Sequence, residues 1–201
     1  MSNESNPFST RYVRPGALRY EFPPGIDAGT FVGRLEKNQW WGQIVGPHGS
    51  GKTTLIETLI PELQRAGRLI QRFTLRAQDR RPYRRRFSSC RWDPDTVAIV
   101  DGYQQLSAWN RFQLRTSCRR ARCGLLVTAH QSLGLPHLIN TRADLDTAGL
   151  IVQQLLADEP GILSYADVAE CFRQQHGNCR EMLFALYDLY QQRQWERGQV
   201  C

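Results

Sequence analysis

One stretch of nine residues constrains the fold of this 201-residue chain more than any other part of its sequence. The stretch is Gly46, Pro47, His48, Gly49, Ser50, Gly51, Lys52, Thr53 and Thr54. It follows a short apolar segment, residues 43–45, and precedes a segment whose leucines and isoleucines share one helical face. A strand, a glycine-rich loop and an amphipathic helix in this order predict an α/β fold with a mostly parallel sheet.

The loop fits the pattern G-x-x-x-x-G-K-[ST] at every position. Its glycines let backbone N–H groups approach an anion closely, and the positive end of the following helix favours phosphate. Lys52 can reach the β- and γ-phosphates of a nucleotide, and the Thr53 hydroxyl can bind Mg²⁺. Residues 46–54 are therefore expected to bind a nucleoside triphosphate, and in this segment the sequence resembles the P-loop NTPases.

A second signal is the apolar run at residues 96–100, which ends in Asp101. Ligands of parallel sheets bind at the carboxyl ends of the strands, so Asp101 is expected beside the loop, where it would hold Mg²⁺ together with Thr53. Asp101 resembles the Walker-B aspartate. Some related ATPases carry a glutamate at the next position to polarise the attacking water, and this chain has Gly102.

Gln104 or Gln105 could instead position the water through a side-chain amide, although neither can act as a general base. The sequence therefore predicts nucleotide binding with slow or partner-stimulated hydrolysis.

Other apolar patterns predict the rest of a three-layer P-loop core. Further strands are expected at residues 68–75, 124–129 and 137–139. A helix is expected at residues 105–121, with Leu106, Trp109 and Phe112 on one face.

The C-terminal part of the chain has a helical character. One helix is expected from Asp144 or Asp146 to about residue 157, and two more begin at Ser164 and Asn178. We expect an N-terminal arm at residues 1–30, the P-loop core at 31–158 and a small helical lid at 159–201.

The order of these elements resembles the AAA-type and STAND ATPases. The resemblance places Thr128 where those families carry a polar sensor-1 residue near the γ-phosphate. Residues 177–181 resemble the G-N-x-R-E start of their sensor-2 helix, so Arg180 would reach back to the nucleotide. The catalytic residues implied by these patterns are Lys52, Asp101, Gln104, Thr128 and Arg180.

AAA-type assemblies also take an arginine from a neighbouring subunit. Arg142 is a candidate without a diagnostic pattern, so an oligomer is possible but no arginine finger is assigned.

The nucleotide is expected to be ATP. Guanine-specific GTPases carry an N/T-K-x-D element, and the only lysines in this chain are Lys37 and Lys52, neither of which stands in one. The chain also lacks an L-S-G-G-Q sequence, which argues against an ABC-type ATPase. The expected cofactors are therefore ATP and Mg²⁺.

Positive charge is concentrated in the middle of the chain. Residues 65–122 contain fifteen arginines and four acidic residues, whereas the net charge of the whole chain is +7. Segment 80–91 mixes arginines with aromatic residues, which suits nucleic acid or an acidic protein partner, and also a solvated loop. The arginines proposed to contact a partner are Arg80, Arg81, Arg84, Arg85 and Arg86.

Two other functions fit parts of the sequence. A small-molecule kinase is one, because Asp101-Gly102-Tyr103 resembles the D-G-F/Y stretch of adenylate-type kinases, although the expected Pro-Arg is replaced by two glutamines. A nucleic-acid-associated ATPase that uses segment 80–91 is the other. A P-loop scaffold that binds no nucleotide is disfavoured by the intact loop.

The six cysteines form no C-x-x-C pair and no zinc-ligand pattern, which fits reduced thiols and a cytoplasmic protein. No apolar run approaches the roughly 18 residues of a membrane span, and the N-terminus lacks the apolar core of a signal peptide. The sequence therefore predicts no membrane partner.

Overall fold

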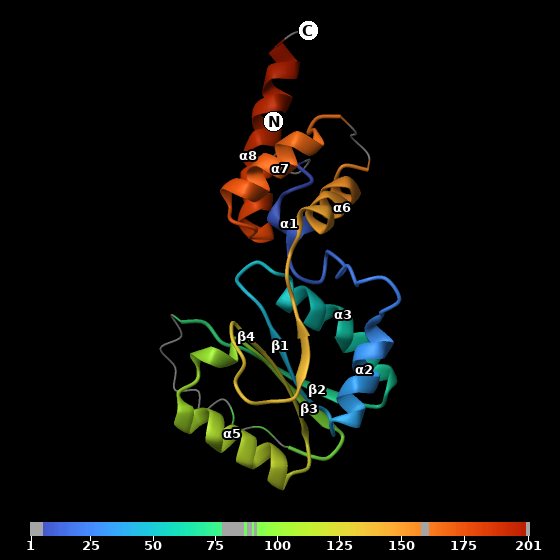
Figure 1. The fold of residues 1–201 in the computed structure, drawn as a ribbon, viewed down its shortest axis with the longest axis vertical. Helices are drawn as coiled ribbons and strands as arrows, with labels where there is room; N and C mark the ends of the chain where they lie inside the picture. The colour runs from blue at the N-terminus through green and yellow to red at the C-terminus, as the bar shows by residue number, and fades with distance from the viewer. Residues whose placement is uncertain (1–5, 78–86, 88–89, 91, 158–160, 200–201) are drawn as a thin grey trace. The chain divides into compact units, whose positions relative to one another are not determined.

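The computed structural model describes residues 6–77, 87, 90, 92–157 and 161–199 (Figure 1). The five partner-contacting arginines predicted between residues 80 and 86 lie outside the described residues. Contacts within the chain divide it into two units. The helical unit comprises Met1–Glu21, Pro47–Thr54 and Arg142–Cys201, and the sheet unit comprises Phe22–Gly46 and Leu55–Thr141.

The sheet unit contains a five-stranded sheet in the order β2-β3-β4-β1-β5, and every neighbouring pair is parallel. The strands are β1 Trp41–Val45, β2 Leu69–Thr74, β3 Thr96–Asp101, β4 Gly124–Ala129 and β5 His137–Asn140. β3 and β4 lie inside the sheet and are buried on both faces, which explains their continuous apolar sequences. The predicted α/β fold with a mostly parallel sheet is confirmed.

Helices lie on both faces of this sheet. Figure 1 shows one long helix, α5, on one side and α2 and α3 on the other. The helices are α2 Ala28–Lys37, α3 Lys52–Arg65 and α5 Ala108–Arg120, with a short 3-10 helix η1 at Tyr103–Gln105. This arrangement is the three-layer architecture that the sequence predicts.

Helix α2 was not anticipated from the sequence, and it begins inside the segment that we expected to be an N-terminal arm. Its start is fixed by Asp27, whose side chain accepts a hydrogen bond from the Thr30 amide at 2.8 Å. Phe31, Val32 and Leu35 are buried along one face. A capping residue followed by this spacing is a local signal that could have revealed the helix.

The prediction for α5 is wrong in one respect, because Leu106, Trp109 and Phe112 do not share a buried face. Ser107 caps the helix by accepting from the Asn110 amide at 3.2 Å, so Leu106 precedes the helix and is buried separately. The helix buries Leu114 and Cys118 instead, and the rings of Trp109 and Phe112 face solvent.

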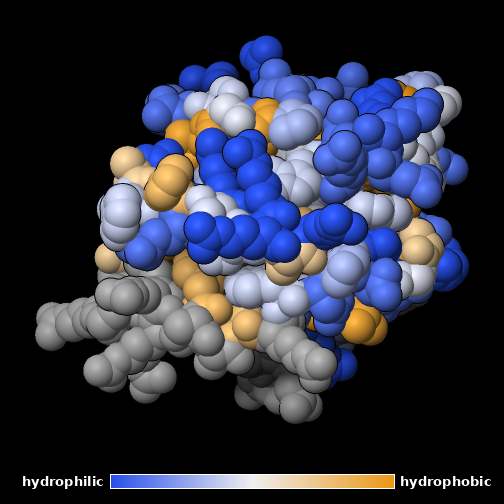
Figure 2. Space-filling model, turned by 90° about the horizontal axis from the view of Figure 1, so that it is seen from below, coloured by the Kyte–Doolittle hydropathy of each residue, from blue (hydrophilic) through white to orange (hydrophobic). Residues whose placement is uncertain are grey.

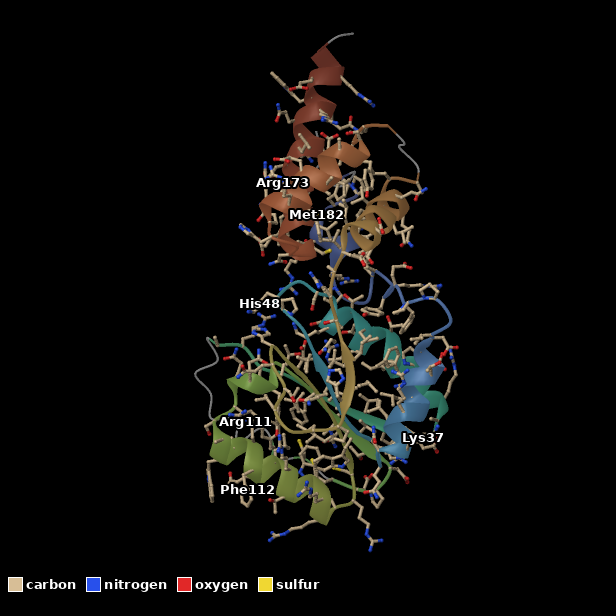
Figure 3. The ribbon with its side chains drawn as sticks, viewed as in Figure 1. Lys37, His48, Arg111, Phe112, Arg173 and Met182 are labelled. Carbon is tan, nitrogen blue, oxygen red and sulfur yellow. The ribbon has the colours of Figure 1, made fainter. Side chains whose placement is uncertain are left out.

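The helical unit contains four helices among its described residues and has its own core. These helices are α1 Thr10–Val13, α6 Leu145–Leu155, α7 Tyr165–Gln174 and α8 Cys179–Gln199. Phe8 from the N-terminal segment packs edge-on against Tyr190 of α8, with ring centroids 5.9 Å apart. Met182, labelled in Figure 3, lies fully buried in the same cluster. The N-terminal segment is thus part of this core.

Polar caps start the helices of this unit where the sequence predicts. Asp144 accepts from the Thr147 amide at 2.8 Å and begins α6. Ser164 and Asp167 form a complete capping box at the start of α7, although aspartate replaces the usual glutamate. Asp167 also binds Arg193 of α8 at 2.6 Å, which connects the two helices.

Among the described residues, the structure has no helix with the length and hydropathy that crossing a membrane requires. The five cysteines in this part of the chain form no disulfide with one another.

Asp167 is expected to stabilise both α7 and α8. Burial opposes ionisation of its carboxyl group, but hydrogen bonds from Arg193 and Ser164 outweigh burial and hold its pKa below the usual value. Asp167→Ala should lower the free energy of unfolding by about 2–3 kcal/mol, because a cap and a charge-assisted hydrogen bond are lost together. Urea unfolding at pH 7 measures this loss.

The matched control is Asp146→Ala, because Asp146 lies exposed in the first turn of α6 and its loss removes a helix-dipole interaction of about 0.3–1 kcal/mol. Folding lowers the pKa of Asp167, so its stabilising effect is complete above about pH 4 and disappears as the pH falls further. Equal losses for the two variants at pH 7 would contradict this assignment.

Candidate functional site

Parallel pairing brings the carboxyl ends of three strands to one edge of the sheet. Val100 of β3 pairs with Val127 of β4, and Ala129 of β4 pairs with Val45 of β1. The Gly46 amide continues this pairing by donating to the Ala129 carbonyl at 3.1 Å. Asp101, Thr128 and the first residue of the glycine loop therefore end or follow adjacent strands.

The Thr128 hydroxyl joins the ends of β3 and β4. It donates to Oδ1 of Asp101 at 2.5 Å and accepts from the Gly102 amide at 2.9 Å. Thr128 is buried, so both bonds form away from water. This pair of bonds fixes the orientation of the Asp101 carboxylate, which the sequence predicts as a Mg²⁺ ligand.

Gly102 occupies a position that only glycine fits. Its φ is +87°, and a Cβ atom built on it would lie 2.4 Å from the carbonyl oxygen of Leu75. The Leu75 amide in turn donates to the Asp101 carbonyl at 2.8 Å, which keeps the two backbones together. A glutamate in place of Gly102 is incompatible with this geometry.

Gln104 of η1 is the nearest amide side chain along the chain to this edge. Its Nε2 atom lies 3.4 Å from Nε2 of His130, which follows the end of β4. Its Oε1 atom is buried and has no hydrogen-bond partner in the part of the chain that the structure describes. Of the two glutamines proposed from the sequence, Gln104 is therefore the one whose side chain we place beside the end of β4.

The remainder of the loop, residues 47–54, belongs to the helical unit. The carbonyl oxygen of Pro47 accepts from Ser50 Oγ at 2.9 Å and from Lys52 Nζ at 2.5 Å. These bonds close the loop on itself. Figure 3 shows His48 where the chain leaves β1.

The start of α8 packs directly on this loop. The Asn178 side chain caps α8, because its Oδ1 accepts from the Arg180 amide at 3.1 Å. A Cβ atom on Gly49 would lie only 1.8 Å from the same Oδ1 and 3.3 Å from the Arg180 nitrogen. Gly49, with φ at +70°, thus has no side chain because the α8 cap occupies that space.

Tyr20 is a loop contact that sequence reasoning missed. Its ring carbon Cε2 lies 3.3 Å from the position that a Cβ atom would take on Gly51. Burial raises the pKa of the Tyr20 hydroxyl. No motif surrounds Tyr20, so the sequence carries no signal for this contact.

The predicted site residues are divided between the two units. Gly46, Asp101, Gln104 and Thr128 belong to the sheet unit. Residues 47–54, which include Lys52, Thr53 and Thr54, belong to the helical unit together with Arg180. The chain connects the two groups directly through the peptide bonds at residues 46–47 and 54–55.

The described residues provide no cluster of metal-binding side chains. Among the described residues, no group of three or more His, Cys, Asp or Glu side chains could hold a metal ion. Mg²⁺ usually takes one or two protein ligands and completes its shell with water and phosphate oxygens. Thr53 and Asp101, the two Mg²⁺ ligands that the sequence predicts, belong to different units, and their joint role stays a prediction.

Gly102→Ala should destabilise the protein by more than its backbone angle alone explains. A left-handed non-glycine residue costs about 1–2 kcal/mol, and contact with the Leu75 carbonyl adds to this. Gly67→Ala is the matched control, because Gly67 has φ at +77° with nothing within 4 Å of its Cβ position. Urea unfolding should show a clearly larger loss of unfolding free energy for Gly102→Ala than for Gly67→Ala. Equal losses would show that the backbone near Leu75 moves away to accommodate the new methyl group.

Solved structures similar to this chain share its fold at low sequence identity. A structure described as a DNA replication initiation factor aligns with 78% of this chain and 57% of its own, at a TM-score of 0.54 and 17% identity. The structure of AMPPCP-bound DnaA from Aquifex aeolicus aligns with 82% of this chain and 64% of its own, at a TM-score of 0.53 and 14% identity. The structure of replication initiator DnaA bound to AMPPCP and single-stranded DNA aligns with 80% of this chain and 59% of its own, at a TM-score of 0.52 and 17% identity.

This chain thus spans less than two thirds of the length of each of these structures. No protein-family model and no curated protein sequence matches it. The structural likeness agrees with the all-parallel five-stranded sheet and its flanking helices. The chain therefore shares the α/β fold of these structures.

Proposed function

We propose that this protein binds ATP with Mg²⁺ and hydrolyses it slowly, or faster with a partner, as a nucleotide-dependent switch or motor. The observation that carries the proposal is the complete loop sequence, which begins at Gly46 directly after β1, combined with the oriented carboxylate of Asp101 at the carboxyl end of β3. Two of the similar structures are described as bound to AMPPCP, which supports a nucleotide as the ligand.

Each loop residue has a distinct task in this proposal. The backbone amides of residues 47–52 and the Lys52 ammonium bind phosphate oxygens, and Lys52 leaves the Pro47 carbonyl to do so. Thr53 and Asp101 would hold Mg²⁺, which when bound neutralises charge on the phosphates. Thr128 keeps Asp101 in the orientation that this requires.

The helices after residue 159 would respond to the nucleotide as a lid. Asn178 and the Arg180 backbone already contact the loop at Gly49, within the helical unit. The Arg180 side chain is exposed, so it is available to pair with a phosphate. Nucleotide binding at the loop would therefore affect the start of α8.

Hydrolysis is expected to be slow because the chain provides no carboxylate after Asp101. A water oxygen attacks the γ-phosphorus, the bond to the bridging oxygen of ADP breaks, and a proton leaves to solvent with ADP and phosphate as the other products. The Gln104 amide can orient that water but cannot take its proton. A partner that completes the site would raise the rate.

Lys52→Ala should abolish measurable ATP binding and leave the fold intact, because this side chain interacts within the loop and not in the core. Isothermal titration with ATP and Mg²⁺ measures binding, and circular dichroism measures the fold. Lys37→Ala removes the other lysine and should bind ATP as the wild type does. A Lys52→Ala variant with wild-type affinity, or one that loses its circular dichroism signal, would overturn the assignment.

Gln104→Ala should lower the rate of ATP hydrolysis at least about tenfold without weakening ATP binding, since it removes an interaction made with the attacking water only. Gln105→Ala is the control at the adjacent position. Phosphate release under saturating ATP and a parallel ATP titration separate the two effects. A loss of binding that matches the loss of rate would show that Gln104 has a structural role.

The same assay distinguishes the competing functions. Phosphate release that depends on Lys52 supports an ATPase, and stimulation by single-stranded DNA or RNA would make it a nucleic-acid-associated one. ADP formed together with a phosphorylated nucleoside monophosphate, without free phosphate, would identify a small-molecule kinase instead.

A further inference from the structure

Helix α5 carries two large aromatic rings on its solvent side. Trp109 is 64% exposed and Phe112 is 60% exposed, although both are residues that a helix normally buries. The rings stack on one another, with centroids 5.8 Å apart and planes at 26°. Because Leu114 and Cys118 form the buried face of α5, the core does not need this aromatic pair.

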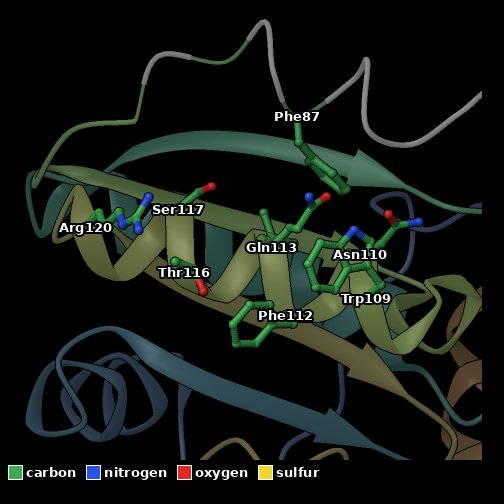
Figure 4. Close-up of a pocket in the computed structure, with 9 residues that line it drawn as sticks. Phe87, Trp109, Asn110, Phe112, Gln113, Thr116, Ser117 and Arg120 are labelled. Carbon is green, nitrogen blue, oxygen red and sulfur yellow. The ribbon is translucent and has the colours of Figure 1, made fainter.

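The aromatic pair borders an open groove of about 390 Å³ (Figure 4). Figure 4 shows Phe87 pointing toward α5 from the opposite rim. The groove also presents amide and hydroxyl groups and one guanidinium, from Asn110, Gln113, Thr116, Ser117 and Arg120. It therefore offers flat apolar surfaces next to hydrogen-bond donors and a positive charge. The face shown in Figure 2 is mostly hydrophilic, with smaller hydrophobic patches.

The segment that contains α5 carries charge of one sign. Residues 102–143 contain no aspartate or glutamate, whereas α5 alone contains Arg111, Arg115, Arg119 and Arg120. In the described part of the chain, none of these four arginines forms an ion pair.

Two of these arginines are engaged inside the sheet unit. Arg115 Nε donates to the Tyr103 hydroxyl at 3.0 Å, and the Arg119 guanidinium lies over the Trp41 ring. Arg120 is exposed and lines the groove. A partner with negative charge is thus favoured over an apolar or basic protein segment.

We propose that this face of α5 binds single-stranded nucleic acid. Bases would stack on Trp109 and Phe112, and Arg120 would contact the phosphate backbone. Asn110 and Gln113 can hydrogen-bond base edges. The strand must be single because the faces of paired bases are covered by their neighbours in a duplex. This site is separate from the loop that binds ATP in our proposal, and binding to it needs no nucleotide.

The test measures binding of fluorescein-labelled 20-nucleotide DNA and RNA, single-stranded and duplex, by fluorescence anisotropy without ATP. Trp109→Ala/Phe112→Ala should weaken single-strand binding at least about tenfold, since stacking contributes roughly 1–3 kcal/mol per base. The matched control is Trp195→Ala/Phe184→Ala, which removes two exposed rings from α8. Trp109→Phe keeps a ring and should retain most of the affinity.

Two further variants locate the phosphate contacts. Arg120→Ala should reduce the dependence of log Kd on log salt by about 0.7 for one lost contact to a single strand. Arg84→Ala/Arg85→Ala/Arg86→Ala removes three arginines of segment 80–91. In that background, loss of the aromatic pair should still weaken binding.

Equal affinity of the wild type and Trp109→Ala/Phe112→Ala, with both proteins melting at the same temperature, would overturn the proposal. Equal binding of duplex and single strands would do so as well. A third outcome would also overturn it. If the wild type binds no nucleic acid and light scattering shows that it is a dimer while Trp109→Ala/Phe112→Ala is a monomer, the groove binds a second copy of this chain.

Discussion

Parallel pairing of β3, β4 and β1 is the constraint on which the rest of the site depends. Parallel strands share the direction of their carboxyl ends, so Asp101, Thr128 and Gly46 must reach the same edge of the sheet. The interior strands β3 and β4 are buried, and Asp101 and Thr128 lie at or near their carboxyl ends. The Thr128 hydroxyl, shared between the Asp101 carboxylate and the Gly102 amide, completes the arrangement.

The same packing limits the chemistry of the site. The backbone turns sharply after Asp101, and the Leu75 carbonyl lies where a side chain on residue 102 would begin. An acidic residue that could polarise water is therefore excluded by sterics at this position. What remains nearby is the Gln104 amide, which can orient water without accepting its proton. In the proposed ATPase, this absence of a carboxylate is the reason to expect slow intrinsic hydrolysis.

The glycine loop is also tied to the C-terminal helices. Asn178 caps α8 and fills the space over Gly49, so one carboxamide connects a helix start to the glycine loop. The N-terminal segment joins the same unit through Phe8 and Tyr20. Segments at both ends of the chain thus pack with the loop, which explains why the contacts group residues 47–54 with the helical unit.

The sequence by itself determined the features that are local. Neighbouring residues are enough to identify the loop pattern, the continuous apolar strands and the caps Asp144 and Ser164. The structure has these strands and caps at the expected positions. Thr128 was placed by a family resemblance and the order of elements. Helix α2, which the apolar patterns do not predict, also has a local signal in its capping residue Asp27.

Only the tertiary structure decided the strand order, the contact of Asn178 with Gly49 and the outward direction of Trp109 and Phe112. These features join residues far apart in the chain, or depend on which side of a helix meets the sheet. Helical periodicity identifies a possible apolar face, but the cap at Ser107 and the packing of Leu114 and Cys118 decide which side is buried. Long-range packing supplies that information, and local sequence does not contain it.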